Sequence, residues 1–237
     1  NYWDDLSTDH FQLSRTVTED SEGVIHESKM YYPYNFNSVT PSFTTLESIA
    51  LAEMFNTKNI TSSVIQQEQF KAGIKLSTLR NNFLFTDGYV LPSSVETAKG
   101  SNVLETRVVY HQYDDVGNPL EVSQKDGTRI TYVWGYDQTL PVAKLQNATY
   151  AQVQLALGSG FDLGAGGLTI AQANSLRLIS GALVTTIEYQ WGVGMTAQTD
   201  PNGLTTTYEY DAFGRLKWIK DPSGNIINTF KYNYKGQ

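Results

Sequence analysis

Short runs of aromatic and apolar residues, each ended by a turn that contains Gly, recur along the C-terminal half of the chain. The clearest copy is Tyr208-Glu-Tyr210-Asp-Ala-Phe-Gly214-Arg-Leu216, which is followed by Asp221-Pro-Ser-Gly224. Related copies begin at Tyr113-Asp114 and at Trp191-Gly192. Each copy predicts an aromatic strand, a turn, an apolar strand and a second turn. Repetition of one such unit predicts an extended or spiralling sheet built from many copies.

The turn residues also predict the strand register. Asp221-Pro-Ser-Gly224 suits a type I turn followed by a left-handed Gly, which closes a three-residue loop with a β-bulge. Such a loop pairs Asp221 with Asn225, and further along the strands it pairs Leu216 with Phe230. A two-residue loop would instead scatter the aromatic residues over both faces of the sheet.

A similar loop at residues 212–214 pairs Tyr210 with Leu216 and Tyr208 with Trp218. Because residues directly opposite each other share a face, we predict an antiparallel meander over residues 189–234 with its aromatic residues on one side. The residues predicted on that side are Tyr208, Tyr210, Leu216, Trp218, Ile226, Phe230, Tyr232 and Tyr234.

Residues 1–103 predict a β-rich region of degenerate repeats with one helix. Thr44-Thr-Leu-Glu47 has the form of a capping box, and the helix that follows has a predicted apolar stripe. This stripe consists of Leu46, Ile49, Ala50 and Met54. Turn signals such as Ala72-Gly73 and Asp87-Gly88 separate the β-like runs. These runs are residues 11–17, 24–34, 62–70, 74–85 and 89–97.

Residues 104–237 predict the repeat sheet itself, with a helical insertion at about residues 145–181. Asn147 can cap a short helix that runs through Leu157. After a Gly-rich loop at residues 158–167, Thr169-Ile-Ala-Gln172 has the form of a second capping box. We therefore predict two short helices, at residues 147–157 and 169–178, inserted between two strands, with the loop as a flexible connector.

Composition agrees with a mainly β protein, an antiparallel hairpin meander with a few short inserted helices. Fifteen Tyr and four Trp in 237 residues favour strands. The net charge of −7 argues against nucleic acid and anionic membrane surfaces as partners. With no Cys, the chain has no disulfide or thiolate site. No apolar run approaches the roughly 18 residues that span a membrane, so membrane insertion is not expected.

The repeats resemble those of the RHS/YD-repeat proteins, which are named for a recurring Tyr-Asp pair. Tyr210-Asp-Ala-Phe-Gly-Arg-Leu216 and Asp221-Pro-Ser-Gly224 carry the likeness, which is strong over residues 110–234. Trp134-Gly-Tyr136 and Leu140-Pro-Val-Ala143 are similar to a subgroup from large bacterial secreted or surface proteins. The residues of the repeat motif with an expected structural role are Tyr113, Asp114, Gly117, Tyr208, Tyr210, Asp211, Gly214, Arg215, Leu216, Asp221, Pro222 and Gly224.

The resemblance implies a long antiparallel sheet that coils into a hollow shell. In this family such shells enclose a C-terminal toxin or effector, or mediate surface recognition. The resemblance also implies a location outside the cell or on its surface, at the bacterial envelope. Because the sequence begins with neither an initiator Met nor a signal peptide, we expect it to be part of a longer protein.

Asp200 and Asp221 are the strongest catalytic candidates, since the family ends in a core segment whose aspartates cleave off the cargo. Each, however, opens an Asp-Pro-x-Gly turn, in which a carboxylate accepts backbone N–H groups. The turn role is therefore favoured, and no catalytic residue is expected. His10, His26 and His111 lack metal-ligand spacing, and the Gly-rich loop has no phosphate-binding motif. We accordingly expect neither a metal site nor a cofactor.

These observations favour a non-enzymatic structural module whose partners are neighbouring repeats and a possible toxin or effector cargo. The alternative is a module that binds carbohydrate or a cell surface through exposed Tyr and Trp. The two hypotheses differ in one observable, because a shell should bury its aromatic face, whereas a carbohydrate site should leave ring faces open beside polar groups.

Overall fold

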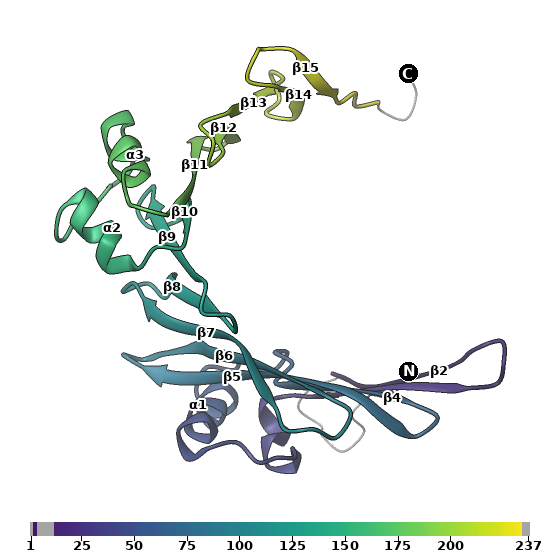
Figure 1. The fold of residues 1–237 in the computed structure, drawn as a ribbon. Coiled ribbons are helices and arrows are strands. Elements are labelled where there is room, and N and C mark those ends of the chain that lie inside the picture. The colour runs from purple at the N-terminus through teal and green to yellow at the C-terminus, as the bar shows by residue number, and fades with distance from the viewer. Residues whose placement is uncertain (1, 4–11, 234–237) are drawn as a thin grey trace. The chain divides into compact units, whose positions relative to one another are not determined.

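The computed structural model describes residues 2, 3 and 12–233, which fall into two compact units (Figure 1). The first unit comprises residues 1–111 with 123–126, and the second comprises residues 112–122 with 127–237. Within each unit, strands that follow one another along the chain are neighbours in an antiparallel arrangement. The predicted fold class, a mainly β hairpin meander with short inserted helices, is therefore confirmed.

The first unit contains a strand meander, one α-helix and one short 3-10 helix. Its strands are β1 (Tyr2–Trp3), β2 (Leu13–Glu19), β3 (Ile25–Tyr31), β4 (Gln66–Lys71), β5 (Ile74–Thr86), β6 (Tyr89–Lys99) and most of β7 (Glu105–Tyr113). The 3-10 helix η1 (Pro33–Ser38) and the helix α1 (Thr45–Asn56) lie between β3 and β4 in the chain. The predicted turns at Ala72-Gly73 and Asp87-Gly88 have positive φ at both residues and join β4 to β5 and β5 to β6.

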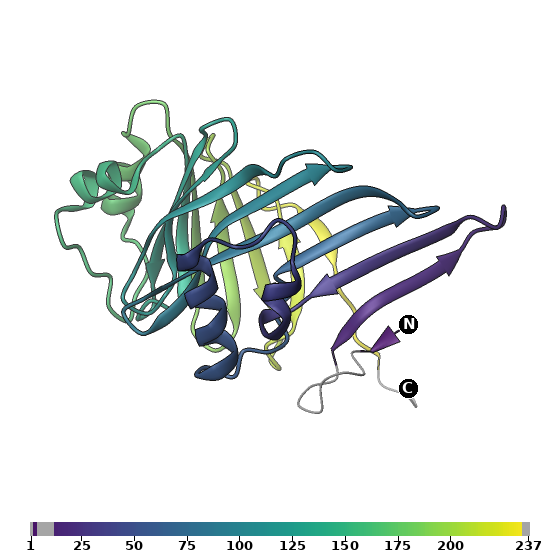
Figure 2. The same ribbon diagram turned by 90° about the horizontal axis from the view of Figure 1, so that it is seen from below.

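Helix α1 begins at the predicted capping box. The Thr44 side chain accepts a hydrogen bond from the Glu47 N–H, and the Thr44 N–H donates to the Glu47 carboxylate. Figure 2 shows α1 lying across one face of the strands of this unit. The buried cluster that includes the inner face of α1 consists of Val39, Phe43, Leu51, Met54 and Ile65.

The predicted apolar stripe of α1 is partly wrong. Ala50 and Met54 are buried as expected, but Leu46 is 76% exposed and Ile49 is 48% exposed. Leu51 is fully buried in their place. One residue turns a helix by about 100°, so the buried face is rotated by roughly one position from the predicted stripe. The packing of α1 on β5 and β6 selects this face.

The second unit contains the repeat strands and a pair of helices. Its strands are most of β8 (Pro119–Gln124), β9 (Arg129–Gly135), β10 (Leu140–Gln146), β11 (Leu183–Gln190), β12 (Gly194–Thr199), β13 (Thr205–Tyr210), β14 (Leu216–Lys220) and β15 (Ile226–Thr229). Helices α2 (Tyr150–Leu157) and α3 (Ile170–Arg177) lie between β10 and β11, which pair directly with each other. The predicted insertion of two helices between two strands is therefore confirmed.

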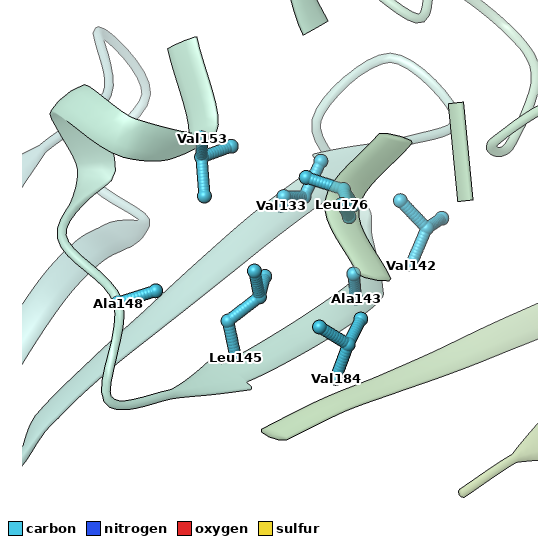
Figure 3. Packing of buried hydrophobic residues seen from close by; sticks show 8 residues of the cluster. All are labelled: Val133, Val142, Ala143, Leu145, Ala148, Val153, Leu176 and Val184. Atoms are coloured by element: carbon cyan, nitrogen blue, oxygen red, sulfur yellow. The ribbon is translucent and has the colours of Figure 1, made fainter. Parts of the chain in front are cut away.

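Helices α2 and α3 pack on the sheet through one buried apolar cluster (Figure 3). Its members are Val133, Val142, Ala143, Leu145, Ala148, Val153, Leu176 and Val184. They come from β9, β10, β11, both helices and the residue that leads into α2. Helices of eight residues are too short to be stable alone, so this burial stabilises them.

The predicted cap of the first inserted helix is wrong by two residues. Thr149, not Asn147, is the N-cap, and its side chain accepts a hydrogen bond from the Gln152 N–H. Asn147 instead adopts a left-handed conformation with φ of 62°. Thr149-Tyr-Ala-Gln152 has the same capping-box form as Thr169-Ile-Ala-Gln172, which begins α3 as predicted. A reciprocal capping box satisfies two backbone N–H donors, here those of Thr149 and Gln152. A lone Asn at the cap would satisfy fewer, so the box determines where the helix begins.

The predicted pairing holds next to the turn of the β13–β14 hairpin but not beyond it. Tyr210 pairs with Leu216 as expected, whereas Trp218 lies opposite Glu209. Tyr208 lies opposite Ile219. Since opposite residues share a face, Tyr208 and Trp218 lie on opposite faces, and the prediction of a single aromatic face is wrong.

The β14–β15 hairpin departs from the prediction in the same way. The Asp221 N–H donates to the Asn225 carbonyl, as the predicted loop requires. The Phe230 N–H, however, donates to the carbonyl of Lys217 and not to that of its predicted partner Leu216. Tyr234, which was predicted on the aromatic face, lies outside the described residues.

An extra residue on the second strand of the hairpin causes these shifts. It is Lys217 in β13–β14 and Ile227 in β14–β15. Thr196 occupies the equivalent place in β11–β12. Each lies two residues beyond the residue that closes its turn, and a β-bulge of this kind reverses the face of every residue that follows.

Candidate functional site

Five turns of the chain share one hydrogen-bonding arrangement built on an Asp and a Gly three residues later. In each turn the Asp carboxylate accepts from the backbone N–H groups two and four residues further on, at 2.7–3.1 Å. The Gly N–H donates to the Asp carbonyl at 2.9–3.2 Å. The Gly φ values lie between 72° and 93°, a region that side-chain-bearing residues rarely adopt. The five residues are Asp20, Asp114, Asp200, Asp211 and Asp221.

In three of these turns the hydrogen bonds favour the ionised form of the Asp side chain. The side chain of Arg215 holds the pKa of Asp211 below its usual value, and the side chain of Asn225 does the same for Asp221. The Val24 N–H is the largest cause of the lowered pKa of Asp20. A carboxylate that stays ionised and is held by its own turn is poorly suited to general acid catalysis. This geometry supports the turn role predicted for Asp200 and Asp221.

Tyrosine hydroxyl groups tie the strands of the second unit to one another. The Tyr210 hydroxyl donates to the Met195 carbonyl at 2.7 Å, and the Tyr136 hydroxyl donates to the Tyr189 carbonyl at 2.8 Å. Burial raises the pKa of the Tyr210 hydroxyl and of the Tyr189 hydroxyl, so both hydroxyl groups remain protonated. In two Tyr-Asp pairs the Tyr side chain, at position 136 or 210, thus hydrogen-bonds to another strand. The Asp211 side chain hydrogen-bonds within its own turn.

The last two repeat turns also bring several motif residues into contact. The Arg215 guanidinium pairs with the Asp211 carboxylate at 2.7 Å. It lies 4.6 Å from the ring centre of Tyr232, whose hydroxyl donates to the Leu216 carbonyl. A cation over an aromatic face is attracted by the ring quadrupole. Tyr113, Asp114 and Gly117 lie at a different turn, away from this group.

Arg177 is a structural residue that sequence reasoning did not identify. From the end of α3, its guanidinium donates to the carbonyl of Val184 at 3.1 Å and to that of Asp200 at 2.9 Å. It therefore connects the inserted helices to β11 and to a repeat turn. A basic residue in the last turn of a helix is a weak signal, and nothing in its sequence neighbourhood indicates these two acceptors.

The second unit has a pocket of about 420 Å³ between the Asp114 turn, β9, α2 and the Gly-rich loop. Its polar lining residues are Gln112, Asp114, Asp115, Gln138, Gln154 and Asp162. Its apolar lining residues are Leu120, Val133, Trp134, Tyr150, Phe161 and Leu163. Among the carboxylates of this pocket, only Asp114 was identified from the sequence as a motif residue. The other walls of the pocket meet the Asp114 turn only in the folded chain, so the sequence does not indicate them.

The Gly-rich loop, interpreted from the sequence as a flexible connector, is attached to the turn between β9 and β10. The N–H groups of Tyr136 and Asp137 donate to the carbonyls of Gly166 and Gly164, at 2.8 Å and 2.7 Å. Phe161 and Leu163 pack against the cluster beneath the helices. This attachment positions the loop as one wall of the pocket.

The two described histidines, His26 and His111, have different partners. His26 contacts the Asp20 carboxylate at 3.1 Å, and His111 contacts the Ser123 hydroxyl at 2.7 Å. His10 lies outside the described residues. Within residues 2–3 and 12–233, no group of three or more His, Asp or Glu side chains could hold a metal ion.

Comparison with known families identifies the repeated turns. Residues 192–226 match the family described as RHS Repeat, and this span contains the turns of Asp200, Asp211 and Asp221. The chain therefore contains an RHS repeat. Its matched segment runs from the turn before β12 to the first residue of β15, so one family unit comprises several hairpins of the second unit.

No curated protein matches this chain in sequence. Solved structures with a similar arrangement include the crystal structure of TcdB2-TccC3-Cdc42, at 10% identity, 85% coverage of this chain and a TM-score of 0.37. Another is that of TcdB2-TccC3-TEV, at 11% identity, 88% coverage and a TM-score of 0.38. The chain spans 11% of the length of each of these two proteins.

The described part of the chain includes no helix that combines the length and the apolar character needed to cross a membrane.

Proposed function

We propose that this chain is a structural module of a large secreted or cell-surface protein, to which it contributes strands of a shell that encloses a cargo or presents a surface. The observation that carries the proposal is the repeated Asp–Gly turn, three copies of which lie in the RHS Repeat match. In these turns the functional groups of the motif residues are used in hydrogen bonds that hold hairpins together. The role proposed for the twelve motif residues is therefore structural.

The last strand supports continuation of the sheet by neighbouring repeats. Ile226 and Ile227 are 49% and 56% exposed, and Phe230 and Tyr232 are 40% and 45% exposed. A hairpin repeat buries its apolar surface only when the next repeat packs against it. An exposed strand edge also presents N–H and C=O groups that a further strand can pair with. We propose that the following repeat of the parent protein covers β15.

Hydrogen exchange on two chains tests this proposal. One is the 237-residue chain, and the other continues into the sequence that adjoins it in its gene. We expect slower amide exchange at residues 226–230 in the longer chain, a higher thermal midpoint and less self-association by sedimentation. Strand β12, which already has a partner on each side, is the internal control and should exchange at an unchanged rate. Equal exchange at β15 in the two chains would contradict the shell role.

A cargo partner is the finer part of the proposal. The family resemblance of the repeats supports a C-terminal toxin or effector as the enclosed partner. Expression of the C-terminal region alone and as part of the whole parent protein tests this point. We expect the C-terminal region to resist added protease only when the repeat region is present.

A further inference from the structure

The pocket of the second unit has the size and walls of a small-ligand site. Its volume of about 420 Å³ lies at the lower end of the range of roughly 300–1,000 Å³ that is typical of ligand pockets. Its carboxylates come from the Asp114 turn and the Gly-rich loop, and its aromatic walls come from β9, α2 and the same loop. The site thus combines elements that are far apart in the sequence.

Hydrogen bonds hold the walls of this pocket in place. The Tyr150 N–H at the start of α2 donates to the Glu121 carboxylate of β8 at 2.7 Å. The Trp134 indole N–H donates to the Pro119 carbonyl at 3.0 Å. The Asn118 side chain donates to the Gln138 carbonyl at 2.7 Å and to the Asp114 carboxylate at 2.9 Å. A ligand would therefore meet walls that are already positioned, which lowers the entropy cost of binding.

The lining of the pocket is negatively charged. Three of its twelve residues are aspartates, Asp114, Asp115 and Asp162, and the described residues that line it include no Lys, Arg or His. Burial raises the pKa of Tyr150, and the nearby charge of Asp114 raises it further. The negative potential therefore reaches the aromatic wall of the pocket. Asp115 and Asp162 are exposed at its rim, where their charge is available to an incoming group.

One further feature of the lining indicates a ligand that donates hydrogen bonds. The Gln138 side-chain oxygen is buried and has no hydrogen-bond partner among the described residues. Gln138 is also the last of three consecutive residues, Tyr136, Asp137 and Gln138, with φ between 52° and 60°. Each left-handed residue other than Gly costs about 1 kcal/mol or more, and such strain is concentrated at functional sites.

The aromatic wall is suited to the same kind of ligand. Trp134, Tyr150 and Phe161 line the pocket, and the rings of Tyr150 and Phe161 contact each other with centres 6.3 Å apart. Aromatic faces attract cations within about 6 Å and also cover an apolar stem. A neutral polar ligand can only donate hydrogen bonds to the three carboxylates, whereas a cation is also attracted by their charge and by the aromatic faces.

We propose that this pocket binds a guanidinium or ammonium group carried on an apolar stem, with Asp115 and Asp162 facing the charge and Trp134 and Tyr150 contacting the stem. Such a group can come from a basic side chain of a polypeptide partner or from a free small amine. This binding goes beyond the shell role. The shell role concerns the pairing of neighbouring repeats, whereas every residue that lines the pocket belongs to the second unit.

Calorimetric titration of the whole chain with three probes tests the proposal. The probes are a capped Gly-Arg-Gly peptide, agmatine, and the same peptide with citrulline, a neutral isostere, in place of arginine. We expect saturable binding of at least one cationic probe and at least about tenfold weaker binding of the citrulline peptide. Affinity should fall as the salt concentration rises from about 20 mM to about 300 mM, since salt screens the carboxylates.

Two variants locate the binding. Asp115→Asn and Asp162→Asn each remove one charge, and the asparagine oxygen at position 162 can still accept from the Gly164 N–H, as Asp162 does at 2.8 Å. Each should weaken the cationic probe about fivefold, the factor that corresponds to one partly exposed ion pair. Glu188→Gln is the matched control, because it removes the same charge from an exposed residue of the same unit outside this pocket.

Each outcome decides a point. Binding of the peptide but not of agmatine assigns the site to a polypeptide side chain, and the reverse assigns it to a free amine. Equal binding of the citrulline peptide, no binding of either cation, or an equal loss in Glu188→Gln would overturn the proposal. Binding of a neutral disaccharide that is lost in Trp134→Ala, with no binding of the cations, would replace it with a carbohydrate site. Circular dichroism confirms that each variant is folded. The affinities of Asp115→Asn and Asp162→Asn for the cationic probe are measured and interpreted separately.

Discussion

Replacement of Leu176 by Ala should destabilise the second unit strongly. Leu176 is fully buried in α3 and packs among Val133, Val142 and Val153. The change removes three carbon atoms, which accounts for about 2.4 kcal/mol at roughly 0.8 kcal/mol per buried methylene. The cavity left between helix and sheet adds to this, and Leu→Ala changes in cores cost about 2–5 kcal/mol. We therefore expect a loss of about 3–4 kcal/mol.

Leu178→Ala is the matched control, because Leu178 caps the same helix and is 84% exposed. Its replacement should change the free energy of unfolding by less than about 0.5 kcal/mol. Urea unfolding followed by tryptophan emission is a suitable assay, since Trp134, Trp191 and Trp218 lie in the second unit. With a slope of about 2 kcal/mol per molar urea, Leu176→Ala should lower the midpoint by about 1.5–2 M. Equal midpoints for the two variants would refute the packing of α3 on the sheet.

Three further changes test other parts of the structure. Gly135→Ala should lower the free energy of unfolding in urea by about 2 kcal/mol, because an added Cβ would lie 2.6 Å from the Gly166 carbonyl oxygen. The control Gly166→Ala meets no such contact and should leave the free energy of unfolding nearly unchanged. Thr149→Ala should lose about 1 kcal/mol by removing the cap of α2, and Thr149→Ser should retain it; an equal loss in both would exclude the capping hydrogen bond as the cause. Burial and the charge of Glu68 raise the pKa of Tyr31 to about 12, so the unfolded chain releases this proton first, and stability should fall between about pH 10 and pH 12. Alkaline unfolding of Tyr31→Phe should have a weaker pH dependence over that range, and an unchanged profile would contradict the assignment.

Local chemistry explains which features could be predicted from the sequence. The capping boxes at Thr44 and Thr169 and the turn at Asp221 each use hydrogen bonds between residues at most four positions apart. Such motifs form with little help from the rest of the molecule, so residue type and spacing indicate them. The cap at Thr149 was missed although it has the same form, because Asn147 is also a preferred capping residue.

The strand register could be predicted only as far as the turn chemistry reaches. Tyr210 and Leu216 pair because the Asp211 turn sets their positions, but the bulge at Lys217 places Trp218 opposite Glu209. The Asp200 turn has the same hydrogen bonds, yet Thr199 and Gln198 pair with Thr205 and Thr206 without an extra residue. The hydrogen bonds of the turn therefore do not decide whether a bulge follows it.

The sequence by itself determined the hairpin turns and the start of α3, because hydrogen bonds between residues a few positions apart form both. The RHS repeat was recognised from the resemblance of its motif. Only the tertiary structure decided which helix face is buried, so that Leu51 is covered while Leu46 is exposed. It also brought Asp115, Trp134 and Asp162 to one pocket from a turn, a strand and a loop. The physical reason is range: backbone hydrogen bonds in a turn depend on adjacent residues, whereas burial and pocket formation depend on surfaces that meet only when distant strands pair and the helices pack on them.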